Sequence, residues 1–226
     1  MKRILCLILS LISVFLFVAC GKEGTGGIGK TETLYYENGQ IKEHDEYYKN
    51  GKLKSSVTYY EDGQIAGRGE GNEDGNPISH TGYYKNGQIS HQWDFWENGK
   101  FKSYIDYYEN GQIRRQCECY EDGKDKIATE YFEDGRVNKE IEYYTNGNYK
   151  SYIEYSDFYG KVQIECYENG EYKSYITYHE NGQMRRHTEY YDNGNEKEVT
   201  FYDENGKRQQ TTYYDEDGNV TDRREY

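Results

Sequence analysis

The sequence YYENGQ occupies residues 35–40 and 107–112, and close variants of it recur along the chain. YYEDGQ lies at 59–64, YYKNGQ at 83–88 and YHENGQ at 178–183. Asn-Gly and Asp-Gly are typical of tight hairpin turns, because glycine reaches positive φ without steric cost and Asn and Asp tolerate it better than most residues. Each copy therefore predicts a pair of aromatic residues at the end of a strand, followed by a reversal of the chain.

The turn glycines keep a spacing of twelve residues along nearly the whole chain, with one interruption around Gly160. A fixed period indicates a repeat architecture, so it outweighs the local propensities of any one segment. About nine residues rich in Tyr, Ile, Thr and Val separate consecutive turns, which suits a strand of roughly 30 Å. The sequence therefore predicts one strand and one turn per unit. The regular glycines are Gly39, Gly51, Gly63, Gly75, Gly87, Gly99, Gly111, Gly123, Gly135, Gly147, Gly170, Gly182, Gly194, Gly206 and Gly218.

Apolar and polar residues alternate within each predicted strand. In the strand after Gly51, Leu53, Val57 and Tyr59 alternate with polar residues such as Lys54. Alternation of this kind indicates a strand that is buried on one side. We expect every strand to place the same positions on the same face.

A three-residue Glu-Asn-Gly loop predicts the register between neighbouring strands. It places Tyr47 beside Leu53, Tyr59 beside Ile65 and Tyr107 beside Ile113. The same register predicts cross-strand ion pairs on the other face, each contributing about 0.2–1 kcal/mol. These pairs are Glu46–Lys54, Asp94–Lys102, Asp106–Arg114 and Glu189–Lys197. The expected fold class is all-β: an elongated antiparallel β-meander of repeated hairpins, with about sixteen strands in a single twisted sheet.

Two stretches depart from the period. QIAGRGEGNEDGNPISH, residues 64–80, lacks the tyrosine pair and contains Pro77, so it predicts a weakened strand pair or a hinge. SDFYGKVQIECYENG, residues 156–170, falls one residue short of the regular spacing, and we expect a distorted hairpin and a bend there. Loss of repeat regularity is the preferred interpretation of both stretches over a functional kink.

Residues 1–19 predict a secretory signal. Two basic residues precede an apolar run from Ile4 to Ala19, which is too short for a stable membrane span. The run ends in FVAC at residues 17–20, which resembles a bacterial lipobox, although Phe17 stands where that motif usually has Leu. In a lipobox the cysteine is lipidated and becomes the mature N-terminus, so we expect lipidation at Cys20. The alternative is an ordinary signal peptide with an incidental cysteine.

A lipid on Cys20 predicts attachment to the membrane of the bacterial cell envelope. Lys22 follows Gly21 where Asp would signal inner-membrane retention, so the outer membrane or cell surface is expected if the host is Gram-negative. Residues 20–33 then contain the lipidated cysteine and a glycine-rich flexible tether. Residues 34–226 form the repeat domain.

The mature chain is strongly acidic. Removing Lys2 and Arg3 with the signal leaves 28 − 2 = 26 basic residues against 41 acidic ones, a formal net charge of −15. Such a surface repels phosphate backbones, so nucleic acid is not an expected partner. The 29 tyrosines nevertheless distinguish the chain from a disordered acidic tail.

The run YYENGQIKEHDEYYKNGKLKSSVTYYEDGQ, residues 35–64, resembles the MORN-type repeat, in particular the bacterial variant of YwqK-family proteins. Two twelve-residue units match one such repeat of about 23 residues, and the resemblance extends from Tyr35 to the C-terminus. The usual MORN consensus has more Gly and Trp between its strands, and this sequence departs from the consensus there. The resemblance implies a β-hairpin ribbon that binds rather than catalyses, and an antitoxin role as in some YwqK-type proteins.

Residues that usually carry chemistry form no recognisable site in the sequence. Cys117 and Cys119 lie two apart on one strand face, about 7 Å from each other, which is too far for an easy disulfide. They would need a further ligand to bind a soft metal, and no histidine or third cysteine is near in sequence. We expect these two cysteines and Cys166 to be buried packing residues, with no metal site and no cofactor. The histidines are scattered without metal-ligand spacing: His44, His80, His91, His179 and His187.

Every acidic residue recurs at a repeat position, whereas an active site needs unique residues, so the sequence does not predict an enzyme. The expected function is a membrane-anchored scaffold that binds a partner protein on an extended tyrosine-rich sheet surface. The alternatives are a YwqK-like antitoxin or immunity protein, and a module that binds cell-wall carbohydrate. The candidate binding residues are Tyr36, Tyr48, Tyr60, Tyr84, Trp96, Tyr108, Tyr144 and Tyr191.

Overall fold

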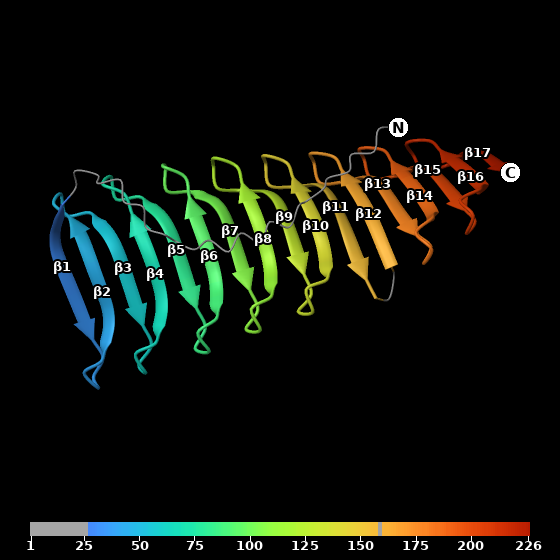
Figure 1. The fold of residues 1–226 in the computed structure, drawn as a ribbon. Helices are drawn as coiled ribbons and strands as arrows, with labels where there is room; N and C mark the ends of the chain where they lie inside the picture. The colour runs from blue at the N-terminus through green and yellow to red at the C-terminus, as the bar shows by residue number, and fades with distance from the viewer. Residues whose placement is uncertain (1–26, 158–159) are drawn as a thin grey trace.

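The structure, a computed structural model, describes residues 27–157 and 160–226. The predicted signal peptide and Cys20 lie outside the described residues. Seventeen strands form one antiparallel sheet, a long single layer in which each strand pairs with the next along the chain (Figure 1). The strands are β1 (Ile28–Tyr35), β2 (Ile41–Tyr48), β3 (Leu53–Tyr59), β4 (Ile65–Gly71), β5 (Pro77–Tyr83), β6 (Ile89–Phe95), β7 (Phe101–Tyr107), β8 (Ile113–Cys119), β9 (Asp125–Tyr131), β10 (Val137–Tyr143), β11 (Tyr149–Ser156), β12 (Gly160–Cys166), β13 (Tyr172–Tyr178), β14 (Met184–Tyr190), β15 (Glu196–Tyr202), β16 (Arg208–Tyr214) and β17 (Val220–Glu225).

The predicted all-β meander of hairpins is confirmed, with one strand more than expected. The additional strand is β1, which begins at Ile28 within the stretch predicted as a tether. It pairs with β2 through contacts such as Thr33 opposite His44, so an edge of the sheet orders this segment. Among the described residues, no helix has the length and hydropathy of a membrane span.

The turns have the geometry that their sequence predicts. The Tyr36 N–H donates to the Gln40 carbonyl at 2.8 Å, and the Gly39 N–H donates to the Tyr36 carbonyl at 2.9 Å. These two bonds close a three-residue loop, and Gly39 adopts a φ of 85°, a value that residues with a Cβ rarely adopt. The same pair of bonds recurs from turn to turn, which explains the constant spacing of the glycines.

The register follows the prediction next to each turn and then shifts by one residue. Tyr47 lies opposite Leu53 as expected, but Glu46 pairs with Ser55 instead of Lys54. A one-residue β-bulge therefore follows the turn, and it recurs in most hairpins. The four predicted ion pairs are consequently not directly opposed. Of the four predicted pairs, only Asp106–Arg114 lies within ion-pair distance in the structure, at 3.4 Å.

The bulge also corrects the prediction that all strands point the same positions to the same face. One additional residue per hairpin reverses the alternation, so successive strands present equivalent positions on opposite faces. The structural unit is therefore the hairpin of two strands. One face, here called the aromatic face, carries the directly paired row Gly69, His80, Trp93, Tyr104, Cys117, Ala128, Ile141, Tyr152, Ile164, Tyr175, Thr188 and Val199. The other, the acidic face, carries the row Glu46, Ser55, Glu70, Ser79, Asp94, Ser103, Glu118, Ile127, Glu142, Ser151, Glu165, Ser174 and Glu189.

Burial in this single layer comes from neighbours on the same face. Ala128 and Ile141 are buried on the aromatic face. They are covered by the rings of Tyr104, Tyr143 and Tyr152, which pack against them. Long aromatic side chains thus supply the cover that a second layer gives in other folds.

Both irregular stretches form paired strands, so the predicted weakened strand pair is wrong for residues 64–80, whereas the hairpin of residues 156–170 departs from the others in its register. β4 and β5 keep the usual register, with Gly69 opposite His80 and Pro77 at the start of β5. β11 and β12 pair without any register shift up to Ser156 opposite Gly160. The residue missing from the sequence period corresponds to the missing bulge.

Candidate functional site

The eight candidate binding residues lie at the turns. The turns form two rows, one at each end of the strands, and these rows are here called the two long edges of the sheet. The Tyr108 hydroxyl donates to the Tyr131 carbonyl at 2.9 Å, and Trp96 Nε1 donates to the Tyr120 carbonyl at 3.2 Å. Each of the others donates in the same way to a carbonyl two strands further on. These contacts, here called the edge bonds, join successive turns of one edge. A role of these residues in binding stays a prediction.

The asparagine of the turn motif adds a second edge bond. Asn110 Nδ2 donates to the Glu133 carbonyl at 3.0 Å, while its Oδ1 accepts from the Gln112 N–H at 2.9 Å. An aspartate can only accept, and where Asp122 replaces Asn the ammonium of Lys124 donates to the next turn instead, at 2.9 Å from the Thr145 carbonyl. The repeated Asn-Gly is therefore both a turn signal and a link between turns.

Some basic residues at the bulges lie over the aromatic rings beside the turns, whereas Arg114, Lys150 and Lys173 form ion pairs with the preceding strand. Lys102 Nζ lies 5.3 Å from the ring centroid of Trp96, and Lys197 Nζ lies 5.8 Å from that of Tyr191. Both lysines were predicted to form cross-strand ion pairs. Each such cation–π contact contributes about 0.5–1 kcal/mol at an exposed site.

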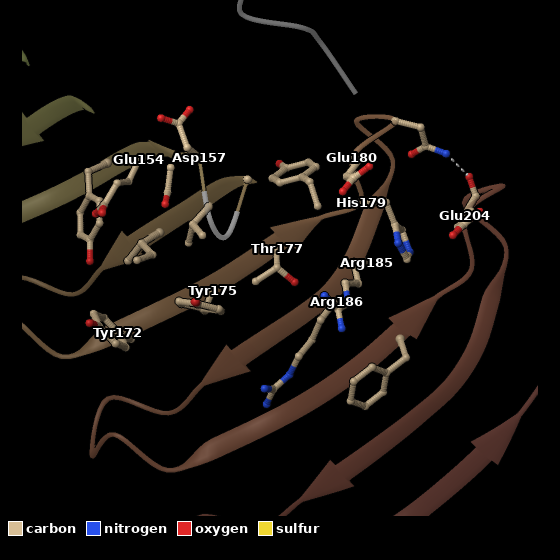
Figure 2. A pocket seen from close by; sticks show the side chains of 18 residues that line it. Glu154, Asp157, Tyr172, Tyr175, Thr177, His179, Glu180, Arg185, Arg186 and Glu204 are labelled. Atoms are coloured by element: carbon tan, nitrogen blue, oxygen red, sulfur yellow. Dashed lines mark hydrogen bonds between the residues drawn. The ribbon is translucent and has the colours of Figure 1, made fainter. Parts of the chain in front are cut away.

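A broad hollow of about 1480 Å³ lies on the aromatic face over β11–β15, here called the aromatic hollow (Figure 2). Its floor carries Tyr152, Tyr172, Tyr175 and Phe201, which come from the three strands β11, β13 and β15. Tyr172 and Phe201 are 44% and 41% exposed, which is high for large apolar side chains. The hollow therefore presents aromatic area that residues 27–157 and 160–226 leave uncovered.

Two arginines, Arg185 and Arg186, lie in the aromatic hollow with acidic side chains around them. Arg186 Nη2 donates to Glu196 Oε1 at 2.8 Å, and the guanidinium of Arg186 lies 5.7 Å from the ring centroid of Phe201. Burial raises the pKa of the Tyr152 phenol, so this ring stays neutral throughout the physiological range. Acidic side chains lie around the hollow: Glu154, Asp157, Glu180 and Glu204.

A smaller groove of about 380 Å³ crosses the aromatic face at β3–β6, here called the glycine groove. Gly67, Gly69 and Gly71 of β4 leave its floor without side chains. One wall contains Leu53, Ser56 and Thr58, and the opposite wall contains His80, Trp93 and Phe95. The glycines that predicted a weak strand therefore create a trough in an otherwise regular sheet.

His80 and Trp93 of the groove wall stack with a third ring, His91, which does not itself line the groove. His80 and His91 stack with centroids 5.0 Å apart, and His91 and Trp93 stack at 4.1 Å. His80 Nδ1 and His91 Nε2 share a hydrogen bond of 3.0 Å. A Cβ at Gly82 would lie 2.2 Å from the His91 ring, so glycine is required for this stack.

Burial lowers the pKa of His80 below its ordinary value of 6.5. It also lowers the pKa of His91, and the neighbouring His80 adds to that effect. Both rings are therefore neutral at pH 7. Arg68 and Glu70 also line the groove, but they alternate with the floor glycines, so their side chains belong to the acidic face. The side chains of the two walls carry no charge, in contrast to the strongly acidic chain as a whole.

The prediction that the histidines are scattered is wrong for His80 and His91. Directly paired residues on this face lie alternately 11 and 13 apart in sequence, as in Gly69–His80 and His80–Trp93. His80 pairs directly with Trp93, and His91 pairs with Gly82 on the same face, so the two histidines are diagonal neighbours on adjacent strands. The bulge, which sets these offsets, had not been anticipated.

The three predicted packing cysteines are buried, as expected, and their thiols are free. Sequence reasoning missed that Cys117 and Cys119 share their surroundings with Asp125, which starts the next strand. Burial raises the pKa of Cys117 to about 12 and also raises that of Cys119. Both thiols are protonated at neutral pH.

Comparison with protein families matches four segments of the chain, residues 29–47, 45–59, 102–122 and 196–216, to the MORN repeat variant. These four segments are therefore similar to MORN-type repeats. No curated protein matches the sequence.

Among solved structures, the chain is similar to TcdB2-TccC3, at 14% identity over 87% of this chain, with a TM-score of 0.19. It is similar to the Photorhabdus luminescens Tc holotoxin pore, at 11% identity over 82% of this chain and 13% of that one, with a TM-score of 0.19. A porin-like protein from Bacteroides uniformis matches at 10% identity over 84% of this chain and 91% of that one, with a TM-score of 0.18. The chain spans 14% of the length of the TcdB2-TccC3 chain, and TM-scores this low support no transfer of shape or function.

Proposed function

We propose that this MORN-type repeat protein is a non-catalytic binding protein, held at the bacterial cell envelope by a lipid on Cys20, and that the aromatic hollow binds a partner protein. The observation that carries the proposal is the exposed aromatic floor of the hollow with Arg186 among the rings. Aromatic residues and arginine are enriched where protein interfaces concentrate their binding energy. The envelope location rests on the N-terminal sequence alone.

The size of the hollow favours a macromolecule over a small molecule. Small-molecule sites are concave pockets of about 300–1,000 Å³ that enclose most of the ligand. The aromatic hollow, at about 1480 Å³, is larger and lies open along several strands. Its acidic surroundings suit a partner segment in which apolar residues are flanked by Lys or Arg.

The test is capture of envelope proteins by the full chain, followed by affinity measurement with the protein that is captured. Tyr172→Ala and Phe201→Ala each remove an exposed ring from the hollow, and each should weaken binding at least about tenfold. Ile127→Ala is the matched control, because Ile127 is 43% exposed but lies on the acidic face. Equal losses for all three variants, or no loss for the two hollow variants, would overturn the assignment of the hollow.

The identity of the captured protein also decides the antitoxin alternative. Growth arrest caused by that protein, and relieved by co-expression of this chain, would establish an antitoxin or immunity role through the same surface. A captured protein without toxicity supports the scaffold function instead.

The glycine groove favours a second function, the binding of an uncharged sugar from the cell wall. Aromatic wall residues such as Trp93 offer a flat surface for a sugar ring, and Ser56, Thr58 and His80 offer polar groups for its hydroxyls. The neutral walls of the groove are complementary to a ligand without charge. A volume of about 380 Å³ is that of a small-ligand site.

Tryptophan fluorescence tests the sugar function, because the chain contains only two tryptophans. W96F leaves Trp93 in the groove as the single reporter, and W93F leaves Trp96 at the edge. Titration with neutral oligosaccharides, such as chitohexaose and cellohexaose, should change the emission of W96F alone. G69A adds a methyl group to the groove floor 3.5 Å from His80 and should abolish the response. No response in W96F would reject the function for these sugars.

A further inference from the structure

Two cysteines and an aspartate converge on the aromatic face between β8 and β9. Sγ of Cys117, Sγ of Cys119 and a carboxylate oxygen of Asp125 all lie within 4.8 Å of one another. Cys119 lies opposite Asp125 across the bulge, and its thiol faces Oδ1 at 3.9 Å. The other oxygen, Oδ2, accepts from Arg115 at 2.7 Å and from the Tyr104 hydroxyl at 3.0 Å. Oδ1 therefore stays directed at the thiol while Arg115 and Tyr104 fix the carboxylate.

The geometry points to a binding site for one soft monovalent metal ion of the Cu(I) or Ag(I) class, held by the thiolates of Cys117 and Cys119 beside Asp125. Thiolate sulfur selects soft ions. A metal–sulfur bond of about 2.3 Å allows two sulfurs on one ion to lie at most about 4.6 Å apart. The separation of up to 4.8 Å therefore needs only a small side-chain adjustment.

The donor set distinguishes this site from a structural zinc site. Four protein ligands complete a structural zinc site. Within the part of the chain that the structure describes, no histidine and no further cysteine joins the three donor atoms. Soft monovalent ions accept two or three donors, so the cluster suits them without a fourth ligand.

The positive charge of Arg115 favours the bound form. Binding breaks both S–H bonds, forms two metal–sulfur bonds and releases two protons to water, with no electron transferred. The resulting complex of two thiolates and one monovalent ion carries a charge of −1, and the guanidinium of Arg115 lies beside it through Asp125. The cysteines are 4% and 5% exposed, and the rings of Tyr104 and Tyr143 pack over them, which keeps water from the thiolates.

At the equivalent positions of other hairpins, paired thiols and the ion pair with arginine do not occur together. In β12 and β13 the same slots hold Ile164, Cys166 and Tyr172, which gives one thiol and no acid. In β14 and β15 the ion pair recurs as Arg186–Glu196 at 2.8 Å, with Thr188 and Tyr190 in place of the cysteines. Two thiols and an acid occur together only in the β8–β9 hairpin among the hairpins described.

The test is a titration of the full chain with Cu(I) against a colorimetric Cu(I) chelator, without oxygen. Wild type and C166S should each bind one equivalent of Cu(I) more than C117S/C119S binds. The double variant keeps Cys6, Cys20 and Cys166, so it measures any binding by those residues. D125N should weaken the affinity about 10–100-fold, the effect of removing a group that orients metal ligands.

If circular dichroism shows that the double variant does not fold, two further measurements still decide the outcome. C119S alone should lose the equivalent, and X-ray absorption of the Cu(I)-loaded wild type should show two sulfur neighbours per copper. No uptake by the wild type, loss of the equivalent in C166S, or equal binding by all variants would overturn the site.

Discussion

The two long edges of the sheet repeat the same contacts from one end to the other, whereas its two faces change from hairpin to hairpin. Along the edges, turn after turn shows the same loop hydrogen bonds and the same links between turns. On the aromatic face, one hairpin presents glycines, another a histidine stack and another a thiol pair. Repetition at the edges therefore specifies the fold, and departures on the faces mark where ligands can be recognised.

This division follows from what each position contributes to stability. An edge residue bonds to the backbone of a neighbouring turn, so its replacement affects a contact on which the ladder depends. A face residue in a single-layer sheet contacts mainly its neighbours on that face, so it can change without loss of the strand pairing. β4 retains its pairing with three glycines on one face, which illustrates this tolerance.

The largest expected effect comes from replacing a turn glycine. Gly87 has a φ of 83°, and a Cβ there would meet no atom within 4 Å, so Gly87→Ala isolates backbone strain from steric contact. We expect a loss of about 1–2 kcal/mol in the free energy of unfolding, measured by urea denaturation.

Gly69→Ala is the matched control for the strained turn. Gly69 lies within β4 and has no positive φ, and a Cβ there would make an ordinary 3.5 Å contact with His80. This variant should gain about 0.4–1 kcal/mol, because alanine restricts the unfolded chain. Equal losses at both positions would contradict the distinction between edges and faces.

The next effect concerns the edge bond of Tyr108. Tyr108→Phe removes the hydroxyl that donates to the Tyr131 carbonyl, and should cost about 0.5–1.5 kcal/mol. Tyr59 lies on the acidic face, and Tyr59→Phe should be nearly neutral, since its hydroxyl forms no hydrogen bond with the described residues. Thermal unfolding of both variants measures the difference. A greater loss for Tyr59→Phe would show that the face tyrosines hold the sheet together.

A smaller effect is expected at Asn110. Asn110→Asp keeps the acceptor for the Gln112 N–H and removes only the donor to the Glu133 carbonyl. Because this bond is exposed, the loss should be near the lower end for a hydrogen bond, about 0.5 kcal/mol. A loss as large as that of Gly87→Ala would indicate that the turn itself had changed, which the chemical shifts of Gly111 would reveal.

The sequence predicted the edges well and the faces poorly, for a physical reason. The spacing of the glycines determines the turns, and the register beside each turn follows directly, as Tyr47 opposite Leu53 shows. The bulge after the turn leaves no comparable signal, because the lysines that occupy it also suit a regular strand. Without the bulge, residues such as His80 and His91 could not be assigned to the same side, and the glycine groove and the thiol cluster stayed hidden.

The smallest expected effect is a pH dependence confined to the glycine groove. Burial lowers the pKa of His80 and His91 in the folded chain below the ordinary value of 6.5, so the unfolded chain binds protons first as the pH falls. The contribution of these rings to stability is therefore complete above pH 6.5 and is lost as the pH falls through their folded pKa values. The loss should be small, because both rings remain partly in contact with water.

Trp93 reports this titration directly, since His91 stacks on it at 4.1 Å and a protonated imidazole quenches indole fluorescence. In W96F, emission should fall on acidification with a midpoint below 6.5, and His91→Gln should remove the transition. W93F, which keeps only the edge tryptophan, should show no such transition. A midpoint at or above 6.5 would mean that the stack is solvated, and that the groove walls differ from the neutral surface that a sugar ring requires.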